Sequence, residues 1–207
     1  MISWIVASHD PMVLLNNLAA SMVDLGDDEV VVVEDAPSIA VAYNEGQDRA
    51  TFPVRCYIHH DVQVLDLPRL RAELVEHCTE TVGMVGVIGS RTDVLPWWDG
   101  QQCGSILDSR IGFLDSGPGG ECAQLDGVLL ATVHDVKWDE SIPWFHGYDY
   151  DMCRQFLERG LPNWCLDHGR ELIRHNTAGG RSPDLLNGWT EALAALRTKW
   201  GEPRGIG

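Results

Sequence analysis

Basic residues are scarce in this chain of 207 residues. It contains 15 Lys and Arg against 31 Asp and Glu, which gives a formal net charge of −16. A protein that binds nucleic-acid backbones broadly needs a basic surface, so the composition argues against that class. Residues 170–207 hold six of the basic residues and four of the acidic ones, so the C-terminal segment is the locally basic part.

Long apolar runs are missing too. None approaches the ~20 residues that a membrane-spanning helix needs. Residues 1–7 lack a basic region and are interpreted as a strand rather than a signal peptide, so we expect a cytoplasmic protein without a membrane span. The six cysteines include no Cys-x-x-Cys pair, which argues against a zinc ribbon or a disulfide framework and favours buried, reduced thiols.

Apolar segments and amphipathic helical patterns alternate over the first part of the chain. The expected strands cover 2–7, 29–34, 54–60 and 82–88, and the expected helices cover 11–24, 38–50 and 67–80. This order predicts an α/β fold with a parallel, doubly wound sheet. Right-handed crossovers place the carboxyl ends of the strands at one edge, which is where open α/β sheets bind ligands.

The second half of the sequence is less regular. Residues 91–122 are rich in Gly, Asp, Ser and Trp, and we expect them to form a long functional or mobile loop. Further along, the pattern predicts a strand at 128–133, a helix at 149–159, a short strand at 171–175, a loop at 176–181 and a last helix at 182–200.

Polar side chains follow the third expected strand at once, as His59, His60 and Asp61. A carboxylate is a hard oxygen ligand that suits Mg²⁺ or Mn²⁺, and these ions in turn bind phosphates. The alternative is a polar loop that happens to follow a strand. The ends of the other strands bring further polar residues to the same edge: Ser8, His9, Asp10, Asp35, Ser90 and Arg91.

Four blocks of sequence resemble the GT-A-type nucleotide-sugar glycosyltransferases, in particular the family-2-like group of streptomycin-biosynthesis-type proteins. Their order and spacing agree over roughly residues 2–180. The blocks are Ser-x-x-x-Ala-Tyr-Asn-x-Gly from Ser38, Tyr-Ile-His-His-Asp-Val from Tyr57, Leu-Asp-Gly-Val-Leu-Leu-Ala from Leu125, and Phe-His-Gly-Tyr-Asp-Tyr-Asp-Met-Cys from Phe145. The chain departs from the group at His60, where the group carries an acidic residue.

The resemblance implies a GT-A-like fold, which is a Rossmann-type, mostly parallel sheet flanked by helices, with an irregular acceptor-side second half. We expect a single domain over 1–207. Residues 1–90 would form its nucleotide-sugar-binding half, 91–181 its acceptor and catalytic half, and 182–207 a C-terminal helix and tail.

Glycosyl transfer also requires stabilisation of the leaving diphosphate, which a bound Mg²⁺ or Mn²⁺ supplies as a Lewis acid. The resemblance implies metal ligands at Asp61, His175 and His59. Imidazole together with carboxylate suits Mn²⁺ better than Mg²⁺. Without the resemblance, His175 would be interpreted as a surface histidine beside a loop.

The donor, expected to be a UDP-sugar, is bound in related enzymes by the loops after the first two strands. Here these loops offer Ser8, His9 and Asp35, next to His59, His60 and Asp61. Asn44 pins the loop beneath the donor, or is an ordinary amide on a helix surface.

The acceptor hydroxyl must lose a proton, and a carboxylate within reach can accept it. The resemblance places the 145–153 block at the acceptor, so Asp149 is the expected base, followed by Asp151 and Asp126. Asp149 has a structural alternative as the N-cap of the 149–159 helix. Trp97, Trp98, Trp144 and Phe145 are expected either to stack on sugar faces or to pack in the core.

These observations favour a metal-dependent glycosyltransferase that moves a sugar from a nucleotide diphospho-sugar to an acceptor hydroxyl. The alternatives are a non-catalytic nucleotide-sugar or carbohydrate-binding protein of the same fold, and a glycosyltransferase that acts on a hydroxylated base in phage DNA. A nucleotidyltransferase is disfavoured because no Gly-rich phosphate loop follows the first strand. The acceptor stays open: a small molecule, a glycan or lipid-linked sugar, a protein or a modified nucleic-acid base.

Overall fold

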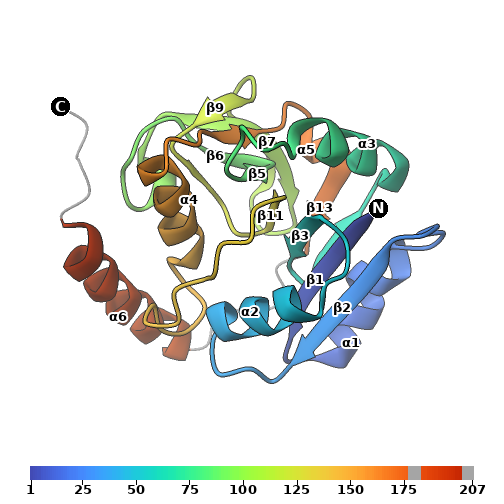
Figure 1. Cartoon of the computed structure of the whole chain (residues 1–207), viewed down its shortest axis with the longest axis horizontal. Helices are drawn as coiled ribbons and strands as arrows, with labels where there is room; N and C mark the ends of the chain where they lie inside the picture. Colours follow the sequence, from blue (N-terminus) through green and yellow to red (C-terminus); the bar gives the residue numbers. More distant parts are fainter. Residues whose placement is uncertain (177–182, 202–207) are drawn as a thin grey trace.

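The computed structural model describes residues 1–176 and 183–201, without the side chains of 183–187. Its larger sheet has seven strands, five of which run in the same direction (Figure 1). In spatial order they are β2 (Glu29–Glu34), β1 (Ile2–Ser8), β3 (Val54–Ile58), β11 (Leu129–Thr132), β5 (Val85–Gly86), β12 (Asn163–Cys165) and β9 (Gly120–Cys122). The predicted α/β class with a mostly parallel sheet is therefore confirmed.

A second sheet lies beside the first and carries part of the site. Its order is β10 (Gln124–Leu125), β6 (Ile88–Ser90), β7 (Gln102–Asp108), β13 (Ile173–His175) and β4 (Val62–Val64), with β8 (Gly112–Asp115) paired to β7. The helical segments are α1 (Pro11–Leu14) with the π-helix η1 (Leu15–Ala19), α2 (Ile39–Arg49), α3 (Leu67–His77), the 3₁₀ turn η2 (Trp97–Asp99), α4 (Tyr148–Glu158), α5 (Gly169–Leu172) and α6 (Pro183–Trp200).

Alternating side chains on the central strands build a core on both faces of the larger sheet. On β1, Trp4 belongs to the cluster that also holds Leu70 of α3, whereas the adjacent Ile5 belongs to the cluster that holds Tyr43 of α2 and Phe156 of α4. This period of two is that of a strand buried on both faces. The sheet is thus fixed between helices, and its carboxyl edge is left for the site.

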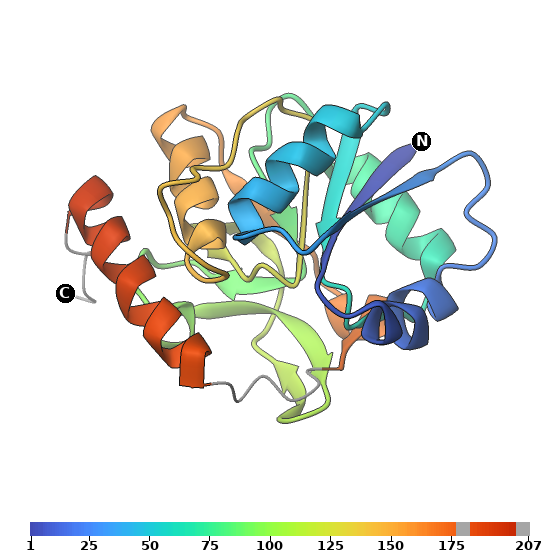
Figure 2. The same ribbon diagram turned by 90° about the horizontal axis from the view of Figure 1, so that it is seen from below.

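Helix α6 lies against α4 at the end of the molecule away from β2, in both Figure 1 and Figure 2. A small apolar cluster joins the two helices, formed by Ile142, Tyr150, Ala192 and Leu196. This contact packs the last described helix against the segment that includes α4.

The first two helices begin at residues whose side chains cap them. Asp10 accepts hydrogen bonds from the backbone N–H groups of Met12 and Val13, and Ser38 accepts one from Val41. These contacts satisfy N–H groups that a helix start leaves without partners. The first helix is shorter than predicted, because its α-helical part gives way to a π-helix at Leu15, and Asp24 has a φ of 66°.

The fourth predicted strand is corrected in two ways. It divides into β5 and β6, which belong to different sheets, and β11 inserts between β3 and β5 in the antiparallel direction. A run of buried apolar residues has no periodicity that reveals strand direction or neighbours, because both faces are covered.

The predicted long loop at 91–122 is also wrong, because it contains η2, β7, β8 and β9. Its glycines do not interrupt the strands. Gly104 of β7 has a φ of 80°, and a Cβ there would lie 2.4 Å from both Cys165 Sγ and the Val87 carbonyl oxygen, so glycine permits close contact between strands. The predicted strand at 171–175 begins as the short helix α5, and only β13 is extended. The loop predicted at 176–181 lies almost wholly outside the described residues.

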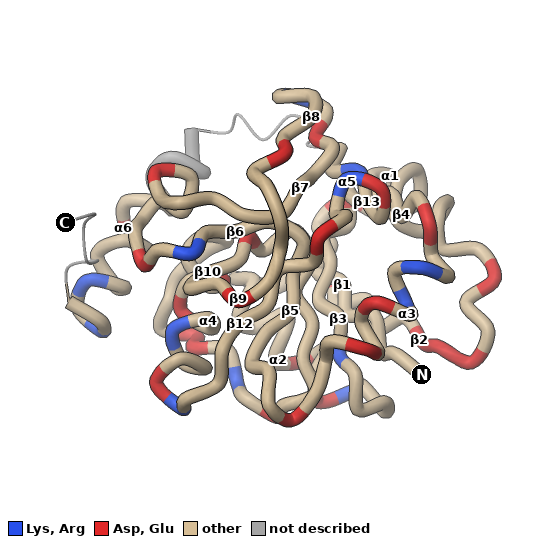
Figure 3. The backbone as a smooth tube through the Cα atoms, turned by 90° about the horizontal axis from the view of Figure 1, so that it is seen from above, with Lys and Arg blue, Asp and Glu red and all other residues tan. Residues whose placement is uncertain are grey.

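All six cysteines are buried and free, as predicted. Within the described part of the chain, no helix has both the length and the apolar character that crossing a membrane requires. In Figure 3, acidic positions outnumber basic ones along the backbone, and Lys and Arg are scattered among them.

Candidate active site

The three residues predicted to be metal ligands come together at the junction of the two sheets. His59 follows β3, Asp61 precedes β4, and His175 ends β13, which pairs with β4 in antiparallel register. Asp61 Oδ1 lies 3.4 Å from His175 Nε2 and 4.0 Å from His59 Nδ1. One ligand atom from each residue falls within 4.8 Å of the others, which is compact enough to surround one cation.

The Asp61 carboxylate supports this interpretation. Its Oδ1 is buried and forms no well-aligned hydrogen bond; it has only the ion-pair contacts with the His175 and His59 ring nitrogens. A buried oxygen without a hydrogen-bond donor or a cation beside it lowers the stability of the folded state, and native proteins rarely contain one. A divalent cation would satisfy it, and a carboxylate with two imidazoles is a ligand set that Mn²⁺ and other first-row metals accept.

The remaining ring nitrogens of both histidines are held by neighbours. His175 Nδ1 lies 2.9 Å from Asp108 Oδ2, and His59 Nε2 lies 2.8 Å from the Tyr148 hydroxyl. Asp108 also accepts from the backbone N–H of Arg110 at 2.7 Å, which ties the β7–β8 turn to the site. Such outer contacts fix the ring orientation and the tautomer, so that the other nitrogen offers its lone pair to the centre.

The charges of the cluster favour an ionised carboxylate. Burial acts to raise the pKa of Asp61, but contact with His175 and the nearby His59 lowers this pKa to about 2. For His59, burial and the His175 charge lower the pKa to about 4. Burial acts to lower the pKa of His175, but the carboxylates of Asp61, Asp126 and Asp108 outweigh it, so this pKa is raised overall. Of the two histidines, His175 therefore holds a proton more tightly than His59.

A cavity of about 310 Å³ opens beside the cluster, and all three ligands line it. Ser8, His9 and His60, which were expected to bind the donor, lie on its wall. Ser8 Oγ is 3.0 Å from His60 Nδ1, and the His9 and His60 ring centroids are 4.7 Å apart. Burial lowers the pKa of His60. The cavity is of the size that holds small-molecule ligands.

Two other predicted donor residues lie elsewhere. Asp35 is exposed, has a φ of 52° and does not line the cavity. Asn44 exchanges hydrogen bonds with Trp138, whose N–H donates to it at 2.9 Å and whose carbonyl accepts from it at 3.0 Å, and it also donates to Glu140. It therefore pins the loop that follows β11 and has no place in the cavity wall.

Asp149 and Asp126 form an acidic pair close to the histidines. Asp149 is half-buried and accepts from the backbone N–H of Gly127 at 3.0 Å and from that of Tyr150 at 2.9 Å. Burial, and then the charge of Asp126, raises the pKa of Asp149 to about 7. The predicted N-cap alternative for Asp149 is wrong, because α4 begins at Tyr148 and its N-cap is Gly147 in the left-handed region.

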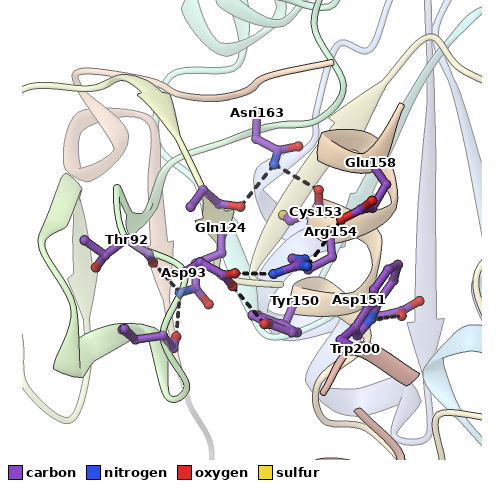
Figure 4. Close-up of polar contacts among 12 residues, drawn as sticks. Thr92, Asp93, Gln124, Tyr150, Asp151, Cys153, Arg154, Glu158, Asn163 and Trp200 are labelled. Atoms are coloured by element: carbon purple, nitrogen blue, oxygen red, sulfur yellow. Dashed lines mark hydrogen bonds and ion pairs between the residues drawn. The ribbon is translucent and has the colours of Figure 1, made fainter. Parts of the chain in front are cut away.

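Asp151 is engaged in structure. Its carboxylate accepts from Trp200 Nε1 at 2.8 Å and pairs with Lys199 Nζ at 2.7 Å (Figure 4 shows the Trp200 contact). It also accepts from Gln155 on the same helix. These partners join α4 to α6. Neither Asp149 nor Asp126 lines the cavity, but Asp126 acts electrostatically on His59, His175 and Asp149.

The predicted aromatic residues are divided between the cavity and the surface. Phe145 lines the cavity. Trp98 and Trp144 are exposed, and Trp97 is half-buried with its ring N–H donating to Asp126 Oδ2 at 2.9 Å.

Sequence reasoning missed four residues of this neighbourhood. Asp108 and Tyr148 hold the histidines, while Arg110 and His146 line the cavity. Asp108 and Arg110 come from the segment predicted to be an irregular loop, so their place beside His175 depends on the pairing of β7 with β13. The position of Tyr148 and His146 inside the Phe145 block was the signal that was available.

Comparison with protein families matches residues 22–164, more than half of the chain, to the Glycosyltransferase like family. No curated protein matches the sequence at a significant level. Among solved structures, A197 from STIV has a TM-score of 0.50 at 13% identity, covering 80% of this chain and 81% of its own. GalNAc-T7, solved with UDP, GalNAc and Mn²⁺, has a TM-score of 0.58 at 12% identity, covering 95% of this chain and 48% of its own.

At these identities the structural likenesses establish the fold alone, and this chain spans about half the length of the GalNAc-T7 chain. The family match is independent of them and extends from residue 22, just after the first helical region, into β12. The chain therefore belongs to the glycosyltransferase-like family and is a glycosyltransferase with a GT-A-like fold.

Proposed function

We propose that this protein is a metal-dependent glycosyltransferase that moves a sugar from a nucleotide diphospho-sugar, with UDP as the nucleotide, to an acceptor hydroxyl. The observation that carries the proposal is the buried Asp61 Oδ1, which lacks a hydrogen bond and faces one nitrogen each of His59 and His175. The neighbour GalNAc-T7 was solved with UDP and Mn²⁺, which supports the same donor and metal here. The four sequence blocks support placing the chain in the streptomycin-biosynthesis-type group.

His59, Asp61 and His175 would hold the cation, which when bound supplies Lewis-acid stabilisation of the leaving diphosphate. Arg110 on the cavity wall adds a permanent positive charge that pairs with phosphate oxygens. Ser8, His9 and His60 offer hydrogen bonds and ring surface for the nucleoside. The apolar wall of Ala7, Val33, Ile39 and Ala42 excludes water from that side.

Asp149 is the proposed general base. In the reaction, the acceptor oxygen forms a bond to the anomeric carbon, the bond from that carbon to the diphosphate oxygen breaks, and the electron pair leaves with the nucleoside diphosphate. The acceptor proton moves to Asp149. A base with a pKa of about 7 is suited to this transfer near neutral pH, and the backbone N–H groups of Gly127 and Tyr150 hold the carboxylate in place.

The test is a panel of nucleoside diphospho-sugars, measured by thermal shift with and without Mn²⁺ and then by release of nucleoside diphosphate. We expect one or more UDP-sugars to stabilise the protein only when Mn²⁺ is present. Stabilisation that is equal with and without metal, or none with any donor of the panel, would contradict the proposal.

One observation favours a second candidate, a binding protein of the same fold without catalysis. His60 stands where the resembling group has an acidic residue, so the acidic motif is reduced. A catalyst releases UDP from the donor in the presence of Mn²⁺, whereas a binding protein retains the donor intact. Chromatographic analysis of the nucleotide after incubation therefore separates the two functions.

A further inference from the structure

Three tryptophans from two distant segments form a continuous aromatic surface, which we call the tryptophan platform: Trp97, Trp98 and Trp189. We propose that this platform binds a sugar ring of the acceptor, and thus that the acceptor is a carbohydrate. The inference rests on the proposed function and specifies its acceptor.

Ring contacts connect the platform across the fold. The rings of Trp97 and Trp98 meet edge to face, with centroids 5.8 Å apart, and the Trp98 ring stacks on Trp189 of α6 at 6.3 Å with 26° between the planes. The Trp189 ring then meets His146 at 5.7 Å. Because Trp98 is 54% exposed and Trp189 half-buried, these contacts leave ring surface open to solvent.

The two ends of the platform meet the proposed catalytic groups. His146 lines the cavity that contains the proposed metal ligands. At the other end, the Trp97 ring N–H donates to Asp126 at 2.9 Å, and Asp126 is the charge that acts on Asp149. The platform is thus linked through His146 to the cavity wall and through Asp126 to the electrostatic surroundings of Asp149.

The segment that carries Trp97 and Trp98 is fastened to the fold. Gln124 Nε2 donates to the Thr92 and Val94 carbonyls at 2.7 and 2.5 Å, and Asp93 accepts from the Tyr150 hydroxyl at 2.8 Å and pairs with Arg154 (Figure 4). The rings are thus held in place before any ligand arrives, which lowers the entropic cost of binding.

Helix α6 is fastened from the other side. The Trp144 ring N–H donates to Glu191, and a Cβ at Gly188 would lie 3.2 Å from Trp144, so the helix lies directly on the segment before α4. Exposed aromatic surface held this way is typical of binding sites.

The chemistry of the surroundings favours a sugar. A pyranose presents an apolar face of C–H groups to a flat ring and hydroxyls at its edge, and aromatic side chains supply large, rigid contact area. The carboxylate of Asp126, which contacts the Trp97 ring N–H, can accept hydrogen bonds from the hydroxyls of a sugar. A net charge of −16 opposes phosphate-rich acceptors such as DNA.

The test uses saturation-transfer NMR with methyl β-glycosides of glucose, galactose and N-acetylglucosamine and the corresponding β1,4-linked disaccharides. We expect at least one saccharide to bind the wild-type protein. Its apparent Kd should rise at least tenfold in Trp98→Ala and in Trp189→Ala, and less in Trp98→Phe, which keeps a flat ring. The matched control is Phe113→Ala, which removes an exposed ring of β8 outside the platform and should leave binding unchanged.

Circular dichroism and thermal melting check that each variant is folded. The proposal is overturned if no saccharide of the panel binds at tens of millimolar, or if Trp98→Ala and Trp189→Ala, both folded, bind as the wild type does. Preferential binding of a single-stranded DNA probe containing hydroxymethylcytosine also overturns it, in favour of a nucleobase.

Binding of the donor nucleotide is measured separately, by titrating the wild-type protein with UDP and Mn²⁺. Failure of that titration together with platform-dependent saccharide binding removes the transferase proposal and keeps the platform as a sugar-binding site. The reverse pattern keeps the donor site and removes the platform.

Discussion

Replacing Asp149 with asparagine should change the pH dependence of stability as well as catalysis. Burial and Asp126 raise the pKa of Asp149 from 3.8 to about 7. A carboxyl whose pKa is raised by folding binds its proton more tightly in the folded state, so wild-type stability falls as pH rises from about 4 to 7. The amide of the Asp149→Asn variant does not titrate in this range, so the variant lacks this loss.

The size of the effect follows from linkage. For pKa values of 3.8 unfolded and about 7 folded, the charged Asp149 costs the folded state about 2 kcal/mol more at pH 8 than at pH 5.5. The amide also removes one acceptor oxygen that faces a backbone N–H, at a cost of about 1–3 kcal/mol that is the same at every pH. The stability of Asp149→Asn relative to wild type should therefore rise by about 2 kcal/mol over this interval.

The measurement is urea unfolding of both proteins at four pH values from 5.5 to 8, in buffer with a chelator so that metal binding plays no part. Asp151→Asn is the matched control, because Asp151 lies on the same helix but pairs with Lys199. Parallel pH curves for Asp149→Asn and wild type would refute the assignment of a raised pKa.

Catalysis gives the second readout of the same variant. Loss of a general base lowers the transfer rate by roughly 10²–10⁴-fold, whereas UDP and Mn²⁺ should still bind. Asp151→Asn should retain transfer. Full transfer by Asp149→Asn would move the base to Asp126 or Asp151.

Four further outcomes are expected. Asp61→Ala should abolish the Mn²⁺-dependent stabilisation by UDP, which in wild type amounts to about 2.7 kcal/mol at a hundredfold excess over Kd; a persisting shift would contradict its role. Asp108→Ala should weaken Mn²⁺ binding by about 10–100-fold in calorimetry, because His175 loses the acceptor that orients it; unchanged affinity would show that Asp108 is dispensable. Mn²⁺ affinity should fall from pH 8 to pH 6, because Asp61 raises the pKa of His175 and the metal must displace that proton; calorimetry with equal affinities would argue against His175 as a ligand. Gly46→Ala should destabilise the fold by about 1–3 kcal/mol in urea unfolding, because the new Cβ would lie 2.3 Å from Ile5 Cγ2 in the core; wild-type stability would show that Ile5 shifts freely.

The expected elements were predictable where a local rule governs them. The helix expected at 38–50 forms as α2, with Ser38 as its N-cap, and the strand expected at 54–60 forms as β3. Both depend on neighbours within a few residues: a hydroxyl that satisfies a helix N–H, and an apolar run that a buried strand requires. The strand expected at 128–133 also forms, as β11, but the sequence could not give its antiparallel pairing with β3, and it missed β7 altogether, because the pairing partners lie tens of residues away.

For the site, the sequence pointed to Asp61 and His59 because they follow a strand, and to His175 only through the family resemblance. The structure adds Asp108 and Arg110, which no short motif marks. Asp35 shows the opposite limit: it follows a strand at the expected edge, but it is exposed and does not line the cavity. The end of a strand fixes only the edge of the sheet at which a residue lies. Which residues line the cavity depends on the segments that pack over that edge.

By itself, the sequence determined the alternation of strands and helices, the acidic balance and the chemistry offered at the end of β3. Only the tertiary structure decided that β13 pairs with β4 and so sets His175 beside Asp61, and that α6 brings Trp189 onto Trp98. The physical reason is the separation along the chain over which each interaction acts. Capping and periodicity act between residues that are close along the chain, whereas a metal site or an aromatic surface requires segments that only strand pairing and core packing bring together.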